Sequence, residues 1–177
     1  MSSEELEDSS RLDLYLGQDF LTWLWYNSEV RQGQLSTSGG EVFFLAMEQR
    51  IAVEGGAGQS RDIAVSSGPG TSLREAKLGL QSGKKVNRAL MRIELDSEAW
   101  RLQLKAEDFS VSGMKTPRVQ KAREEGEDPD APLLEKVYLI EKCLELVDDL
   151  FAQFLRLRFS QEWSEEARKI GDWIRNL

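Results

Sequence analysis

The spacing of apolar and polar residues changes several times along the chain, and each change marks a predicted element. Residues 1–13 are rich in Ser, Glu and Asp and poor in apolar side chains, which predicts a disordered acidic tail. From Phe20 to Trp25 the large apolar residues fall at helical spacing behind Asp19, a residue type that suits an N-cap. We therefore expect a short helix whose aromatic side chains lie in the core.

Short runs rich in β-branched and aromatic residues follow this helix. They cover residues 41–47, 49–54 and 61–66, each about the length of a strand. Because only Glu48 separates the first two, they are expected to form one bent or bulged strand. The glycine cluster at 55–58 lacks the Lys-Ser/Thr ending of a phosphate-binding loop, so it is interpreted as a hairpin turn.

The next segment predicts a short helix and then a β-hairpin. Ser72 and Glu75 have the spacing of a capping box, and Gly83 stands where helices commonly end. Residues 84–96 and 99–109 then alternate between apolar and polar side chains, as in two strands with one buried face. The exposed face of this hairpin is expected to gather four basic side chains, Arg88, Arg92, Arg101 and Lys105.

The last third of the chain is predicted to be a linker followed by helices. Residues 112–132 combine Gly, Pro and charged residues, and from residue 133 the apolar spacing becomes helical. The sequence thus predicts an α+β fold: an antiparallel sheet packed by helices, with a C-terminal helical arm. The expected organisation is an α+β domain at 14–111, a linker at 112–132, and helices at 133–177 that pack on the domain or on a partner.

Composition narrows the functional classes. The chain has 177 residues, 40% hydrophobic and 31% charged, which is typical of one soluble domain. It has no apolar run resembling a membrane span or a signal peptide, so we expect a cytoplasmic protein without a membrane partner. With one cysteine and no histidine, the chain cannot form Ser-His-Asp or Cys-His catalytic groups, nor a Cys-rich or His-Glu-x-x-His zinc site. We therefore expect no enzyme activity and no cofactor.

Charge is segregated along the sequence. Residues 1–60 sum to −7, residues 61–123 to +6 and residues 124–177 to −7, within a net charge of −8. A segregated acidic protein can still present a positive face to nucleic acid. The alternative is that the central cations neutralise the acidic ends within the same molecule.

Three groups of residues are candidates for function. The first is a phosphate-binding surface extended by a basic arm that runs on to Arg123. Its expected members are Lys84, Lys85, Arg88, Arg92, Arg101, Lys105, Lys115 and Arg118. The second is an apolar seam at steps of three and four residues, suited to oligomerisation or to docking a partner. Its expected members are Val137, Ile140, Leu144, Val147 and Phe151.

The third group is Glu75-Ala76-Lys77, which matches the carboxylate-x-lysine element of many magnesium-dependent nucleases. That element normally lies along a strand, whereas the capping box places this one at a helix start. The acidic pairs 148–149 and 165–166 are interpreted as solvated helix faces.

One family resemblance emerges from the order of these features. The chain resembles the C-terminal half of the bacterial recombination-associated RdgC proteins in four features that occur in the same order. They are the run Phe20-Leu21-Thr22-Trp23-Leu24-Trp25, Thr71-Ser72 at a helix start, Gly83-Lys84-Lys85-Val86, and the hairpin to Phe109. The resemblance covers roughly residues 17–158. It implies a mixed α/β fold, dimers that close a ring around duplex DNA, sequence-independent binding and restraint of recombinase filament assembly.

By the same resemblance, Lys84, and with it Lys85 and Arg88, falls where the family offers a basic group. The chain begins where the second half of the family begins. We therefore expect a homodimer, or a separate partner that supplies the other half, or a stand-alone derivative with a changed partner. The favoured function is a non-catalytic module that binds double-stranded DNA; the alternatives are a protein-interaction subunit and a magnesium-dependent nuclease.

Overall fold

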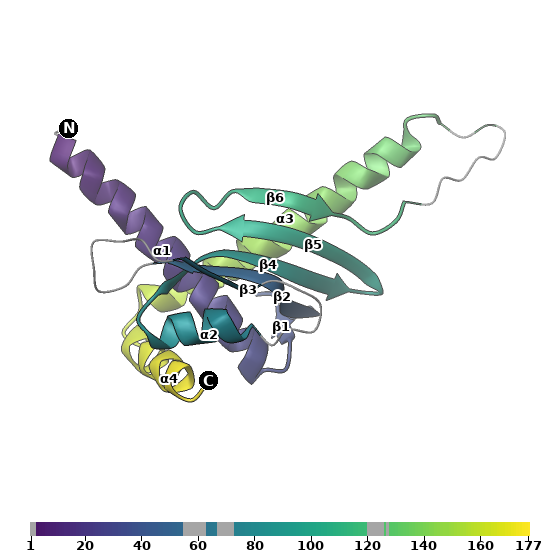
Figure 1. Ribbon diagram of the computed structural model, residues 1–177. Coiled ribbons are helices and arrows are strands. Elements are labelled where there is room, and N and C mark those ends of the chain that lie inside the picture. Colours follow the sequence, from purple (N-terminus) through teal and green to yellow (C-terminus); the bar gives the residue numbers. More distant parts are fainter. Residues whose placement is uncertain (1–2, 55–62, 67–72, 120–125, 127) are drawn as a thin grey trace.

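The computed structural model describes residues 3–54, 63–66, 73–119, 126 and 128–177 (Figure 1). It begins with a long helix. Helix α1 spans Ser3–Val30. Its middle turns bury Phe20, Leu21, Leu24 and Trp25, each no more than 1% exposed. The prediction that these side chains anchor the core is confirmed.

The strands form one antiparallel sheet, built from residues 34–66 and 85–115. Its strands are β1 (Gln34–Ser36), β2 (Val42–Glu54), β3 (Ile63–Ser66), β4 (Lys85–Leu95), β5 (Glu98–Lys105) and β6 (Val111–Lys115). The order across the sheet is β1-β2-β4-β5-β6, and β3 also pairs with β2. The predicted β-hairpin is the β4–β5 pair at the centre of this order.

Strand β2 is one irregular strand, as predicted. Met47 lies opposite Met91 and Ile51 lies opposite Ala89, so β2 uses more residues than β4 between these two pairs. This bulge keeps both flanking parts of β2 in register with the same partner. Val53, beyond the bulge, is fully buried like Phe43 and Leu45 before it.

All four helices lie on one side of the sheet, and the last one packs mainly on the first two helices. The others are α2 (Arg74–Gln81), α3 (Ala131–Arg158) and α4 (Trp163–Arg175). Alternate side chains of β4 and β5, among them Met91 and Trp100, face these helices and are fully buried. The Trp100 indole donates a hydrogen bond of 2.9 Å to the Leu139 carbonyl, which fixes α3 against β5. We call this the inner face of the sheet, and the opposite side the outer face.

The fold class is therefore the predicted one: an α+β architecture with an antiparallel sheet packed by helices and a C-terminal helical region. Within the described ranges, no helix has the length and apolar character needed to cross a membrane.

Two predicted boundaries differ from the structure. Residues 3–13, expected in a disordered tail, form the first turns of α1, because extending an existing helix costs far less than nucleating one. Asp19 consequently lies inside α1 and caps nothing; it pairs with Arg158 at 3.2 Å. Part of the expected linker, residues 112–115, pairs with β5 as strand β6. Pairing with a neighbouring strand decides that segment, since its Ser and Gly have little β-propensity.

The predicted capping box is only partly visible. Ser72 lies outside the described residues, and α2 begins at Arg74 with Leu73 in a left-handed conformation at φ 39°. Leu73, Ala76 and Leu80 are buried on one face of α2, as expected from their spacing.

Candidate nucleic-acid interface

Basic side chains are aligned across three strands of the outer face. Arg88 on β4 lies directly opposite Lys105 on β5. Four residues further along β4, Arg92 lies opposite Arg101, which in turn lies opposite Lys115 on β6. We call these two lines the basic rows. Side chains directly opposite each other on one face are about 5 Å apart at Cβ, so each row brings basic side chains of neighbouring strands together.

The burial pattern fixes the direction in which the basic rows point. Residues between the two rows in sequence, such as Ala89, Met91 and Leu104, are buried on the inner face. Because successive side chains of a strand alternate, the arginines and lysines must lie on the outer face. No helix among the described elements covers that face, and in Figure 1 β4 and β5 lie in front of α3.

Two carboxylates partly neutralise the basic rows. Arg92 pairs with Glu94 at 2.5 Å, and Arg101 pairs with Glu48 of β2. Arg88, Lys105 and Lys115 form no ion pair with any side chain that the structure describes. With respect to the described side chains, the outer face therefore retains Arg88 and Lys105 in one row and Lys115 in the other as unpaired cations.

The pair of Arg101 and Glu48 is also incompletely hydrogen-bonded. Arg101 Nε and Glu48 Oε2 are buried and lack a hydrogen-bond partner within the described part of the chain. Because this Nε–H is buried, a ligand on the outer face cannot reach it, and only the exposed part of the Arg101 side chain is available there.

Lys84 and Lys85 lie away from the basic rows. Both line a cleft of about 320 Å³ between α1, α2 and α4, together with Asp19, Trp163 and Ile170. The Lys84 backbone N–H donates to the Gly79 carbonyl at 3.0 Å and closes the end of α2. This backbone N–H is therefore used by the helix end, and only the ammonium groups of Lys84 and Lys85 remain for a ligand in the cleft.

The remaining residues of the predicted basic surface lie in different places. Arg118 is exposed in the segment after β6. Lys121 and Arg123, predicted to extend the basic arm, lie outside the described residues. Lys115 was predicted in a linker, yet β6 brings it into line with Arg101. Sequence reasoning missed this alignment because Ser112 and Gly113 interrupt any strand pattern.

The predicted oligomerisation seam is divided between interior and surface. Val147 is buried, and the Phe151 ring packs against Phe20 with centroids 5.1 Å apart. Ile140 and Leu144 are half-buried. Val137 is 44% exposed, so the accessible part of the seam is its N-terminal end.

The candidate nuclease element is not arranged as a metal site. Glu75 is exposed in the first turn of α2, and Lys77 pairs with Glu29 of α1 at 3.1 Å. Among the residues that the structure describes, no three His, Cys, Asp or Glu side chains are placed to share a metal ion. The single thiol, Cys143, is buried, and its burial raises the pKa to about 11.

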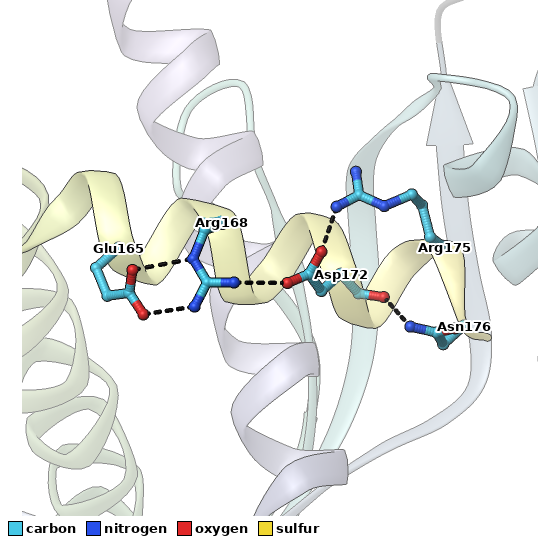
Figure 2. Close-up of polar contacts among 5 residues, drawn as sticks. All are labelled: Glu165, Arg168, Asp172, Arg175 and Asn176. Carbon is cyan, nitrogen blue, oxygen red and sulfur yellow. Dashed lines mark hydrogen bonds and ion pairs between the residues drawn. The ribbon is translucent and has the colours of Figure 1, made fainter.

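The acidic pairs behave differently from each other. Glu165 is exposed on α4, where it forms two hydrogen bonds with Arg168, which also contacts Asp172 at 2.9 Å (Figure 2). These charges are satisfied within one helix face, as expected of a solvated surface. Asp149 instead accepts hydrogen bonds from Ser38 N at 3.0 Å and from Gln153 at 2.7 Å. It therefore connects α3 to the β1–β2 turn and is not simply a solvated group.

Comparison with known proteins adds no assignment: no family model, no curated protein and no solved structure matches the chain.

Proposed function

We propose that this protein is a non-catalytic module that binds DNA through backbone phosphates on the outer face of its sheet, independently of base sequence. One observation carries the proposal: the cross-strand alignment of Arg88 with Lys105 and of Arg92 with Arg101 and Lys115. Lys and Arg are the side chains that supply most of the affinity of proteins for nucleic acid.

The spacing of the basic rows suits a duplex. Four residues of extended chain separate Arg88 from Arg92, which is about 13 Å. That distance is comparable with the roughly 12 Å width of the major groove, so the two rows can meet phosphates of different strands. Phosphate contacts position a protein on DNA but carry no sequence information, which is why the proposed binding is sequence-independent.

The net charge of −8 does not oppose this proposal. Glu165 and Asp172 of α4 are paired with an arginine of the same helix (Figure 2). The exposed carboxylates of α3 belong to a helix that lies behind β4 and β5 in Figure 1, away from the outer face. Solvent at physiological salt screens charges beyond a Debye length of about 8 Å. A phosphate at the outer face therefore meets mainly the basic rows.

We further propose that the module is recombination-associated, and this rests on the RdgC-like resemblance alone. A homodimer, which the same resemblance implies, would present two outer faces to one DNA molecule. Joining two weak sites in this way raises affinity through effective concentration.

The test is fluorescence anisotropy with a labelled duplex of arbitrary sequence, titrated at several salt concentrations. With Arg88, Lys105 and Lys115 each neutralising one phosphate, affinity should fall by about 40-fold between 50 and 200 mM salt. The double variant Arg88→Glu/Lys105→Glu should bind at least about tenfold more weakly, and its log–log salt slope should be shallower by about 2.

The matched control is Lys136→Glu/Lys169→Glu, which changes the net charge equally at exposed sites on α3 and α4. It should keep most of the affinity. A further pair, Lys84→Glu/Lys85→Glu, separates the cleft from the outer face. The proposal is wrong if wild-type protein binds no duplex at low salt, or if the control loses as much affinity as the outer-face variant.

A further inference from the structure

The N-terminal end of α3 projects from the body with apolar side chains exposed. Leu139 is the first buried residue of this helix, so residues 131–138, about 12 Å of helix, extend beyond the packed part. Figure 1 shows this end of α3 reaching past the strands. Its two turns carry Leu133 and Leu134, each 62% exposed, Tyr138 at 58% and Val137 at 44%.

The same line of α3 becomes acidic in the following turns. Leu134, Tyr138, Glu141, Glu145 and Asp148 follow one another at steps of four and three residues, which places them along one side of the helix. Leu133 and Val137 flank the apolar part of this line. We call these seven residues the α3 outer ridge. The buried side chains of α3, such as Cys143, Leu146 and Leu150, lie on the other side of the helix.

The charges of the ridge are unbalanced. Glu141, Glu145 and Asp148 are exposed and form no ion pair with the side chains that the structure describes. Glu141 and Glu145 stand four residues apart, where like charges on a helix repel. The neighbouring Lys142 offers no relief, because it pairs with Glu98 of β5 at 2.9 Å.

We propose that the α3 outer ridge docks an amphipathic helix of a partner protein, one whose apolar stripe is flanked by Lys or Arg. Contiguous exposed apolar side chains on a monomer commonly mark an interaction surface. The acidic turns select a basic partner, because complementary charge steers encounter and excludes like-charged surfaces. A second copy laid along the full ridge would bring carboxylates against carboxylates in the parallel direction, or carboxylates against apolar turns in the antiparallel direction. A phosphate-rich partner would be repelled.

This ridge is separate from the basic rows, so its role does not depend on DNA binding. The two surfaces have opposite charge and lie on opposite sides of the sheet. A molecule of this kind would hold DNA on one side and a basic protein helix on the other.

The test uses a labelled helical peptide built only of leucine and lysine, with leucines on one face, and a second peptide in which glutamate replaces lysine. Binding to the full chain is measured by anisotropy. The leucine–lysine peptide should bind, and the leucine–glutamate peptide should not. The variants Leu134→Ser/Tyr138→Ser and Glu141→Lys/Glu145→Lys should each weaken binding by at least about tenfold, the loss expected when an interface core is removed.

Each variant has a matched control elsewhere on the surface. Val30→Ser/Leu78→Ser removes two other exposed apolar groups, and Glu107→Lys/Glu162→Lys reverses two other exposed carboxylates. Circular dichroism verifies that all variants stay folded, which is expected because every substituted side chain is solvent-accessible. Both controls should bind the leucine–lysine peptide as wild type does.

Three results would overturn the proposal. The first is equal binding of both peptides, and the second is equal loss in a ridge variant and its control. The third is sedimentation of the protein alone as an oligomer that Leu134→Ser/Tyr138→Ser converts to monomer, since the occupant would then be a second copy.

Discussion

At the scale of single residues, Gly17 shows how closely α1 approaches the sheet. A Cβ atom at this position would lie 1.9 Å from the Ala106 carbonyl oxygen and 2.6 Å from its carbon. Both atoms belong to the backbone that follows β5, so no flexible side chain can move aside. Gly17 is therefore the residue that allows α1 to contact this end of the hairpin.

Gly17→Ala should destabilise the protein although alanine favours helix. The gain in helix propensity is about 1 kcal/mol, whereas overpacking against fixed backbone costs about 1–3 kcal/mol or more. With a clash this close we expect a net loss of about 2 kcal/mol in the free energy of unfolding, measured by urea denaturation.

Gly171→Ala on α4 is the control for that measurement. Its Cβ would meet only the Arg175 guanidinium, at 3.7 Å, which is an ordinary contact. This substitution should stabilise the protein by about 1 kcal/mol. If both variants gain stability, the close approach at Gly17 is wrong.

At the scale of elements, the β4–β5 hairpin carries the basic rows, and its turn sets their register. Leu95 pairs with Glu98, and the two residues between them, Asp96 and Ser97, have φ of 48° and 68°. Two positive φ values in a two-residue loop define a type I′ turn, whose twist matches that of paired strands. The register that aligns Arg88 with Lys105 follows from this turn.

Ser97→Gly should stabilise the hairpin. A residue with a Cβ in the left-handed region costs about 1 kcal/mol that glycine avoids, so the midpoint of urea unfolding should rise. Ser164→Gly on α4 is the comparison, and it should lower the midpoint because glycine weakens a helix. A fall in both variants would contradict the turn assignment.

At the scale of the whole molecule, charge that is segregated along the sequence becomes segregated between faces. The acidic C-terminal segment forms α3, which lies behind β4 and β5 in Figure 1, and α4, which packs on α1 and α2, so neither helix covers the basic rows. The sequence left open whether these helices neutralise the central cations. Arg92 and Arg101 find their partners within the sheet, Glu94 and Glu48.

The Asp149 carboxylate links α3 to the β1–β2 turn, which is far from it in the sequence. Asp149 of α3 accepts hydrogen bonds from the backbone of Ser38 in the β1–β2 turn and from Gln153, which also donates to the Ser36 carbonyl at 2.9 Å. Burial acts to raise the pKa of Asp149, but the hydrogen bonds from Gln153 and Ser38, with the charge of Arg156, outweigh it and lower the pKa.

A lowered carboxylate pKa predicts a definite pH dependence of stability. The contribution of Asp149 is complete above its unfolded pKa of 3.8 and is lost as pH falls through the lower folded value. Wild type should therefore lose more unfolding free energy than Asp149→Asn between about pH 5 and pH 2.5, measured by urea unfolding at each pH. Asp148→Asn, one residue away and exposed, should retain the wild-type dependence.

The sequence alone determined the elements that have strong internal periodicity. The alternation around Trp100 and Met91, the bulged run of β2 and the aromatic cluster from Phe20 to Trp25 each identified a buried face, because burial imposes a period on the residues it selects. The same alternation placed Arg88, Arg92, Arg101 and Lys105 on one exposed face.

Only the tertiary structure decided what depends on partners distant in sequence. Strand β6 exists because β5 offers it a hydrogen-bonding edge, so the alignment of Lys115 with Arg101 has no local signal. The separation of Lys84 from the basic rows follows from the packing of α4 beside α2. Which apolar residues of α3 are buried and which project depends on where the sheet ends, and the spacing of those residues carries no information about that edge.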